Sequence, residues 1–165
     1  MDFFEEKLQG IRNQDIVAFE ALYEKLKKPL FTFLFRLTRN HEIAEEVLQE
    51  VFLKLYSSPP KPSTNAKAYI FRMAHNVAID AVKKESRCAE IVHDECIAFD
   101  STIGFEIDDA LERLSERDRK IVTLRINGEF KFREISVILE LPLGTVLWVY
   151  QKAIKQLQIF VGGSQ

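Results

Sequence analysis

The sequence is poor in glycine, proline and cysteine, and each shortage excludes a class of protein. Gly occurs 6 times and Pro 5 times in 165 residues, too few for turn-rich sandwiches and barrels or for a glycine-rich phosphate loop. Two Cys and an acidic N-terminus without a secretion signal indicate a reducing, cytoplasmic setting. No apolar run approaches the roughly 18–20 residues that a membrane helix needs, so we expect no membrane insertion.

Charge divides the chain into segments. Hydrophobic residues make up 47% of the chain, enough for a folded core, and the net charge is −2. The segment 86–110 carries one basic residue against seven acidic ones, whereas the chain is near-neutral before it and basic after it. We therefore expect two modules joined by an acidic linker. Any nucleic-acid binding would come from local faces and not from the overall charge.

Apolar residues recur at helical spacing, and no segment shows the alternation of a strand. We predict a first helix that is ended by Pro29, followed by further helices before and after the acidic segment. The predicted helices span 15–26, 30–37, 42–56, 66–86, 115–126, 131–139 and 144–160. The predicted fold class is therefore all-α. It consists of two small helical domains, at 10–86 and 107–160, joined by a flexible acidic linker at 87–106.

The last two predicted helices are separated by a tight turn that contains Pro142. A short helix, a tight turn and a second helix are typical of the helix-turn-helix that places its second helix in the major groove of DNA. Many compact helical pairs share this pattern, so it leaves DNA binding and plain helix packing both open.

Three stretches of the sequence are distinctive: EIAEEVLQEVFLKLY, AKAYIFRMAHNVAIDAVKKESR and FKFREISVILELPLGTVLWVYQKAIKQL. They resemble bacterial RNA polymerase sigma factors of the extracytoplasmic-function class in the sigma-70 family. The stretch FKFREISVILELPLGTVLWVYQKAIKQL resembles region 4, the DNA-binding region, most distinctively at Pro142, Gly144, Thr145 and Val146. The stretches EIAEEVLQEVFLKLY and AKAYIFRMAHNVAIDAVKKESR resemble two helices of region 2. Because the matches occur in the order of the family, with a linker between them, together they are more specific than either alone.

The resemblance implies three binding surfaces, on which the residue types also make chemical sense. Asn and Arg make directed hydrogen bonds to base edges and phosphates; the competing interpretation of each surface is an ordinary solvated helix face. The −10 promoter element would be bound by Arg72, Asn76, Ile79, Lys83, Ser63, Thr64 and Asn65. Core RNA polymerase would be bound by Glu45, Glu46, Gln49 and Glu50. The −35 element would be bound by Lys131, Arg133, Thr145, Trp148, Val149, Lys152 and Lys155.

Two positions depart from the family pattern in region 4. Val149 stands where an Arg is common, and we expect it on the same helix face as Thr145 and Lys152, which would remove one contact to DNA. Glu140 replaces the Gly usual in the turn, at a cost of about 1 kcal/mol if that position is left-handed. The contact with the −35 element is therefore where this chain differs most from the family.

The predicted function is a transcription initiation factor that binds core RNA polymerase, directs it to specific promoters and helps open the −10 region. Promoter DNA and core polymerase are the expected partners, with an anti-sigma factor as a further candidate. We expect no enzyme activity, catalytic residue, cofactor or small-molecule substrate. Cys88, His93 and Cys96 lie close in sequence, but a structural zinc site needs four ligands, so we predict no metal site.

Two other functions stay open. In the first, the scaffold is sigma-like but the apolar Leu147, Trp148 and Val149 bind a protein partner in place of DNA. In the second, the chain is an ordinary helix-turn-helix repressor or activator that never binds core polymerase. The resemblance to region 2 opposes the second, because such a regulator has no use for a separate module that opens DNA.

Overall fold

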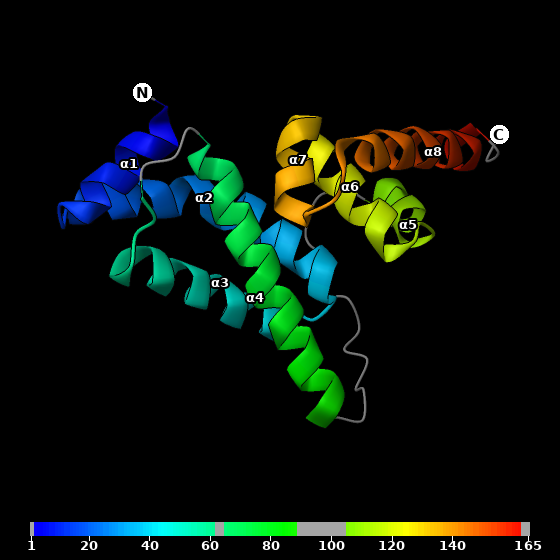
Figure 1. The fold of residues 1–165 in the computed structure, drawn as a ribbon. Helices are drawn as coiled ribbons and strands as arrows, with labels where there is room; N and C mark the ends of the chain where they lie inside the picture. The colour runs from blue at the N-terminus through cyan, green and yellow to red at the C-terminus, as the bar shows by residue number, and fades with distance from the viewer. Residues whose placement is uncertain (1, 62–64, 89–104, 163–165) are drawn as a thin grey trace. The chain divides into compact units, whose positions relative to one another are not determined.

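The computed structural model describes residues 2–61, 65–88 and 105–162 (Figure 1). Within these residues the regular elements are helices and there is no strand, so the all-α prediction is confirmed. The helices are α1 (Phe3–Arg12), α2 (Ile16–Thr38), α3 (His41–Ser57), α4 (Ala66–Cys88), α5 (Phe105–Glu112), α6 (Glu116–Ile126), α7 (Phe132–Leu139) and α8 (Leu143–Gly162).

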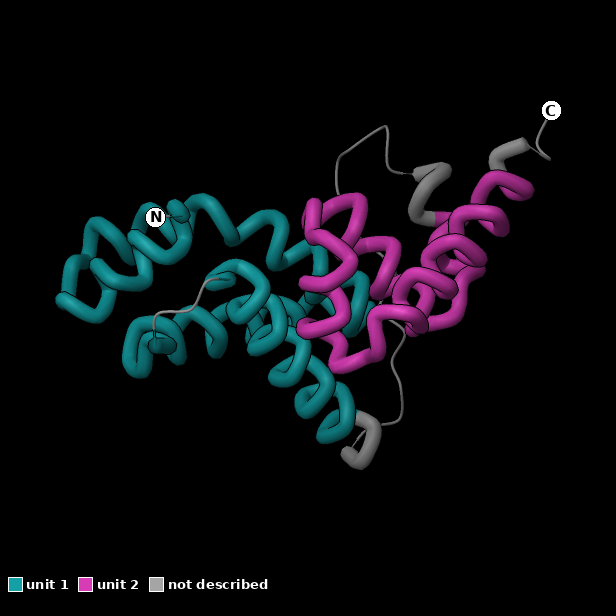
Figure 2. The backbone as a smooth tube through the Cα atoms, turned by 45° about the horizontal axis from the view of Figure 1, so that its top comes forward, with its two compact units in different colours: residues 1–94 teal, residues 95–165 magenta. Residues whose placement is uncertain are grey.

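The chain divides into two compact units (Figure 2). Unit 1 comprises residues 1–94 and contains α1 to α4, and unit 2 comprises residues 95–165 and contains α5 to α8. The boundary between the units lies inside the predicted linker, most of which falls outside the described residues. The domain limits proposed from the sequence, 10–86 and 107–160, stay predictions.

Helix α2 runs from Ile16 to Thr38 without a break, so the expected interruption at Pro29 is wrong. Proline cannot donate to the carbonyl four residues earlier and crowds that turn, which costs roughly 3 kcal/mol. Leu26 and Leu30, on either side of it, are fully buried, and Phe33, Leu34 and other residues continue the same buried face. Burying each such side chain stabilises by roughly 1.5–3 kcal/mol. The packing of this face therefore holds the helix together through the proline.

Helices α3 and α4 complete unit 1 by packing against α2 and against each other. Helix α3 begins as predicted, because the side-chain oxygen of Asn40 accepts the backbone N–H of Ile43 at 3.1 Å. Its buried face contains Ala44, Val47, Val51 and other apolar residues at helical spacing. Helix α4 buries several alanines together with Ile70, and small side chains let helix axes approach closely. Both helices thus turn a polar side away from the core.

Unit 2 is built around α8, which packs against α5, α6 and α7. Helix α6 starts as predicted, because the hydroxyl oxygen of Ser115 accepts the N–H of Asp118 at 3.3 Å. The loop after α6 requires Gly128, since a Cβ there would lie 2.6 Å from the ring of Phe130. These features fix the first helix of the predicted helix-turn-helix relative to the rest of unit 2.

The turn between α7 and α8 is held by Ser136. The N–H of Leu141 donates to the carbonyl of Ser136 at 3.1 Å, and the Ser136 hydroxyl donates back to the carbonyl of Leu141. Glu140 ends α7 in the left-handed region at φ 55°, the strained conformation expected there. The sequence Pro142–Leu143–Gly144 then opens α8. The predicted helix, turn and helix are all present, with their bounds within a residue or two.

Candidate functional site

The predicted −10 surface lies on the polar side of α4. Arg72, Asn76, Ile79 and Lys83 recur every three or four residues, so they share one side of the helix. Asn76 and Lys83 are exposed, and Arg72 and Ile79 are half-buried. The buried Ala74 and Ala78 occupy the opposite side. The structure therefore brings these four residues together on an accessible face.

The loop before α4 is described only at its end. Ser63 and Thr64 lie outside the described residues. The side-chain oxygen of Asn65 accepts the N–H of Ala68 at 3.4 Å, so this oxygen caps the first turn of α4. Asn65 thus fixes the start of α4, the helix that carries the predicted −10 surface.

The predicted polymerase-binding stripe lies on the exposed side of α3. Glu45, Glu46, Gln49 and Glu50 are all exposed. Glu45 lies 3.9 Å from His41 Nε2, and Glu50 lies 3.3 Å from Lys54 Nζ, each one helical turn away. Ion pairs this exposed contribute little to stability. The stripe is therefore an accessible acidic surface whose residues can be changed without unfolding the helix.

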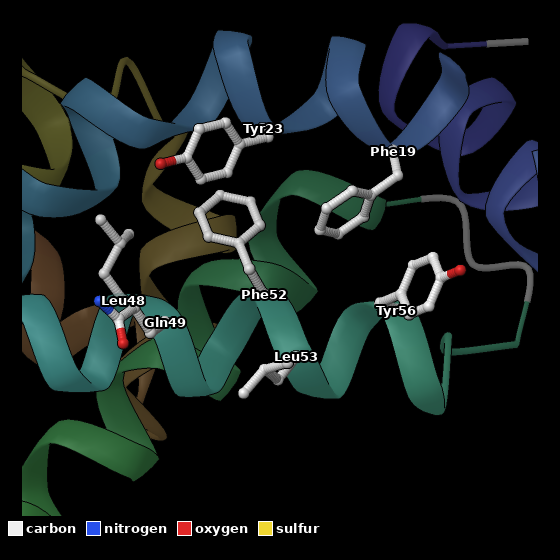
Figure 3. A pocket seen from close by; sticks show the side chains of 7 residues that line it. All are labelled: Phe19, Tyr23, Leu48, Gln49, Phe52, Leu53 and Tyr56. Atoms are coloured by element: carbon white, nitrogen blue, oxygen red, sulfur yellow. The ribbon is translucent and has the colours of Figure 1, made fainter. Parts of the chain in front are cut away.

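An apolar groove, which the sequence analysis did not predict, borders this stripe (Figure 3). It lies between α2 and α3 and has a volume of about 400 Å³. Aromatic pairs line it: the ring centroids of Tyr23 and Phe52 are 4.8 Å apart, and those of Phe19 and Tyr56 are 5.2 Å apart. Leu48, Leu53 and Gln49 complete the lining. Gln49 thus belongs to both the acidic stripe and the groove.

Val149 does not lie on the exposed side of α8, and this corrects the sequence prediction. Its side chain is fully buried, like those of Val146 and Ala153. These three residues follow a spacing of three and four, so they form the stripe that packs α8 into unit 2. Because Val149 is enclosed, it can contact neither DNA nor a protein partner. An Arg at this position would have to enter the core.

The exposed face of α8 consists of other residues. Gly144, Trp148, Lys152 and Lys155 are exposed at spacings of three and four, and Thr145 is half-buried beside them in the first turn. Gln151 is exposed on the same face and was missed by the sequence analysis. Its amide could have been noticed, since Gln is a residue type that pairs with adenine in the major groove.

Trp148 is the largest exposed side chain of this face. It is 59% exposed, and Leu147 next to it is 38% exposed. The Nζ atom of Lys152 lies over the indole, 5.3 Å from its centroid, a cation–π contact that restricts both side chains. The face therefore combines an aromatic surface with an ammonium group one turn along the helix.

The remaining predicted −35 residues, Lys131 and Arg133, are exposed at the start of α7. The backbone N–H of Lys131 donates to Glu134 Oε1 at 3.2 Å, which fixes the first turn of α7. Arg125 of α6 donates to the carbonyl of Phe130 at 2.9 Å and lies over the ring of Phe132. These contacts therefore hold the first turn of α7 and the segment just before it in place. Lys131 and Arg133 are exposed there.

Few other chemical groups are unusual in the described residues. Burial lowers the pKa of Lys120 in α6, and the nearby Glu116 carboxylate opposes this shift. Among the described residues no group of three or more His, Cys, Asp or Glu could hold a metal ion. His93 and Cys96 lie outside those residues. No helix in the described ranges is long and apolar enough to span a membrane.

Two family models match the chain. Residues 22–88 match sigma-70 region 2, and residues 104–157 match sigma-70 region 4, which together make up more than half of the chain. SigW of Bacillus subtilis (strain 168), an ECF RNA polymerase sigma factor, is 23% identical over 163 residues, covering 86% of this chain and 87% of SigW. SigK of Mycobacterium tuberculosis (strain H37Rv) is 23% identical over 169 residues, covering 92% of this chain and 89% of SigK.

Solved structures share the fold. CnrH, in a complex with the cytosolic domain of CnrY, matches with a TM-score of 0.73 at 16% identity over 99% of this chain and 100% of CnrH. RpoE, in a complex with the anti-sigma factor NepR from Bartonella quintana, matches with a TM-score of 0.71 at 20% identity over 89% of this chain and 98% of RpoE. The chain belongs to the sigma-70 family, and the two relatives named above are ECF RNA polymerase sigma factors.

Proposed function

We propose that this protein binds core RNA polymerase, directs it to specific promoters and helps open the −10 region. One observation carries this conclusion: regions 2 and 4 both match, in that order, and they fall in two separately compact units. A simple repressor or activator would use the helix-turn-helix of unit 2 and would have no role for unit 1. A sigma factor uses both.

Core polymerase binds the acidic stripe of α3 in this proposal, with the neighbouring apolar groove as part of the same surface. Helices commonly dock by placing apolar side chains in a groove while charges at the rim set orientation. Gln49 joins the two features, and the exposed Glu46 and Glu50 supply the negative rim. A polymerase segment with basic residues beside an apolar side chain would fit the acidic stripe and the apolar groove together.

The −10 element binds the polar face of α4. Opening a promoter requires at least one base to leave the stack, at a cost of a few kcal/mol that fixed contacts must offset. Arg72, Asn76 and Lys83 are carried by a packed helix whose start is capped, so the donors are held in place before DNA arrives. The loop residues Ser63, Thr64 and Asn65 extend this proposed site.

The −35 element binds the exposed face of α8, without Val149. Side chains near the start of a recognition helix contact base edges, and more distant basic residues contact phosphates. Thr145 and Trp148 lie in the first two turns, and Lys152 and Lys155 follow on the same face. Gln151 joins this set, and Lys131 and Arg133 contribute from the start of α7.

The protein acts in the cytoplasm, where its polymerase works, and is not itself an enzyme.

An anti-sigma factor is a further proposed partner, because CnrH and RpoE, which share its fold, are each seen bound to another protein. The acidic linker, repelled by DNA, suits a path through a basic channel of the polymerase.

Run-off transcription with the purified chain and core polymerase of its source bacterium tests this function. A pool of genomic promoters from that bacterium serves as template. We expect specific transcripts that require the chain. The interaction-protein alternative predicts none, even when the chain co-purifies with other cellular proteins.

A further inference from the structure

Trp148 is held outside the core of unit 2 by the residues around it. Val146 and Val149 are fully buried on the opposite side of α8, so the helix cannot rotate to hide the indole without exposing them. The indole is 59% exposed and lies within the first two turns of α8. In a helix-turn-helix these turns are the ones that contact base edges in the major groove.

The chemistry of an indole limits what it can recognise there. Trp has one N–H donor and no acceptor, so it cannot form the paired hydrogen bonds that identify guanine or adenine. It offers a broad apolar surface, and Leu147, the preceding residue, is also exposed. The only apolar group that a base presents in the major groove is the C5 methyl of thymine.

The position of Lys152 adds to this argument. Its Nζ lies 5.3 Å from the centroid of the indole, so the ring is already restricted and loses little freedom on binding. The same ammonium group can reach a phosphate beside the base that the indole covers. The pair therefore offers one apolar contact and one positive charge at a single place on the DNA.

We propose that Trp148 is a specificity-determining residue that recognises a thymine through its methyl group in the −35 element. This inference rests on the proposed promoter-binding function of α8. It does not extend to Val149, whose burial removes it from the DNA surface.

Replacing thymine by uracil tests this directly, because it removes the methyl group and leaves every hydrogen bond intact. The holoenzyme, formed from the full chain and core polymerase, first selects duplexes from a library randomised upstream of a fixed −10 sequence. Each thymine of the selected element is then replaced by uracil. We expect one position at which affinity falls about fourfold, as burial of one methyl-sized group is worth about 0.8 kcal/mol.

The effect of the methyl group must also depend on the indole. In Trp148→Ala the thymine and uracil duplexes should bind equally, whereas Trp148→Phe should keep part of the preference. Ile159→Ala is the matched control: Ile159 is an exposed apolar residue of the same helix, at 72%, eleven positions further along. It should show the full fourfold difference.

Two results would overturn the inference while leaving the proposed function intact. One is a holoenzyme that selects an upstream element in which no uracil replacement matters. The other is a fourfold effect that persists in Trp148→Ala, which would assign the methyl contact to another residue. Failure to form a holoenzyme, or to transcribe with it, would instead contradict the proposed function itself and this inference with it.

Discussion

Helices α4 and α8 each present a candidate DNA-binding face, and the two faces differ in chemistry. On α4 the exposed residues include Asn76 and Lys83, which offer hydrogen bonds and charge. On α8, after the exposed Gly144, the first exposed side chains are those of Leu147 and Trp148, and the basic residues come later. The first face is suited to polar capture of an unpaired base, and the second to apolar contact in a closed duplex.

This difference also explains why the sequence pattern locates the polar side of α4 but not the exposed side of α8. The apolar residues of α4 recur with clear gaps, so its polar side is unambiguous. In α8 the run from Leu147 to Tyr150 is continuous in apolar residues, so more than one side could face the core.

The largest effect is expected from Val149→Arg. If Val149 lay on the same face as Thr145 and Lys152, this change would strengthen DNA binding, but the burial of Val149 reverses that expectation. A guanidinium forced into the core without a partner should cost at least about 3–5 kcal/mol, enough to unfold much of unit 2. Denaturant unfolding of the full chain, followed by circular dichroism, measures it.

Gln151→Arg is the matched control, because it adds the same group two residues away on the exposed face. Its stability should change by no more than roughly 0.5 kcal/mol. Its binding to promoter duplexes should become more salt-dependent by about one phosphate contact. A stable Val149→Arg protein with tighter DNA binding would show that α8 is rotated relative to this structure.

The position of Val149 could not be settled from the pattern because two choices fit helical spacing. Helical spacing also allows Val146 and Tyr150, four residues apart, to face inward, whereas the structure buries Val146 and Val149, three apart. Tyr150 is half-buried and packs edge-on against Phe132 of α7, 5.0 Å between ring centroids. Which of these residues is buried depends on the side chains of α6 and α7 against which α8 packs. The sequence of α8 alone does not contain this information.

Other features of the structure also fall into two groups: those set by local sequence and those set by contacts with other helices. The caps at Asn40 and Ser115 are of a kind that local sequence predicts, because a side-chain oxygen bonds to a backbone N–H three residues away. Pro29 was mispredicted, because the burial that keeps α2 helical involves α3 and α4. The groove beside Gln49 was missed, since spacing indicates which residues face a neighbouring helix but not how completely they fill the space.

The next largest effect is expected from reversing two charges on α3. Glu46→Lys with Glu50→Lys should weaken binding to core polymerase by about 30- to 100-fold, because like charges would then meet at the interface. Both residues are exposed, so stability should change little. Asp2→Lys with Glu5→Lys, at the N-cap and in the first turn of α1, makes the same change in net charge and should bind normally. Equal co-purification of both double variants with polymerase would refute the assignment of the stripe.

A smaller effect is expected from Asn76→Ala on α4. The loss of one hydrogen bond to an unpaired base should reduce promoter opening by about five- to tenfold, or roughly 1–1.5 kcal/mol. Asn76 is exposed, so folding and polymerase binding should persist. Permanganate footprinting of the −10 region, with polymerase binding measured on the same samples, separates the two steps. Unchanged opening in both Asn76→Ala and Arg72→Ala would remove this face from the −10 site.

The smallest effect is expected at Glu140, where the backbone rather than the recognition face is changed. Glu140 ends α7 in the left-handed region at φ 55°, which costs a residue with a side chain about 1–2 kcal/mol. Glycine removes that strain but is more flexible in the unfolded chain, so Glu140→Gly should stabilise unit 2 by a net 0.5–1 kcal/mol or so. Glu140→Ala removes the same carboxylate and keeps the strain, so it should not stabilise. A difference between the two variants in the unfolding of unit 2, with unchanged affinity for promoter duplexes, would show that Glu140 affects the stability of the turn and not recognition by α8. If both variants were equally stable, the strain at this turn would contribute nothing, and the substitution of Glu for Gly would have to be explained through the carboxylate.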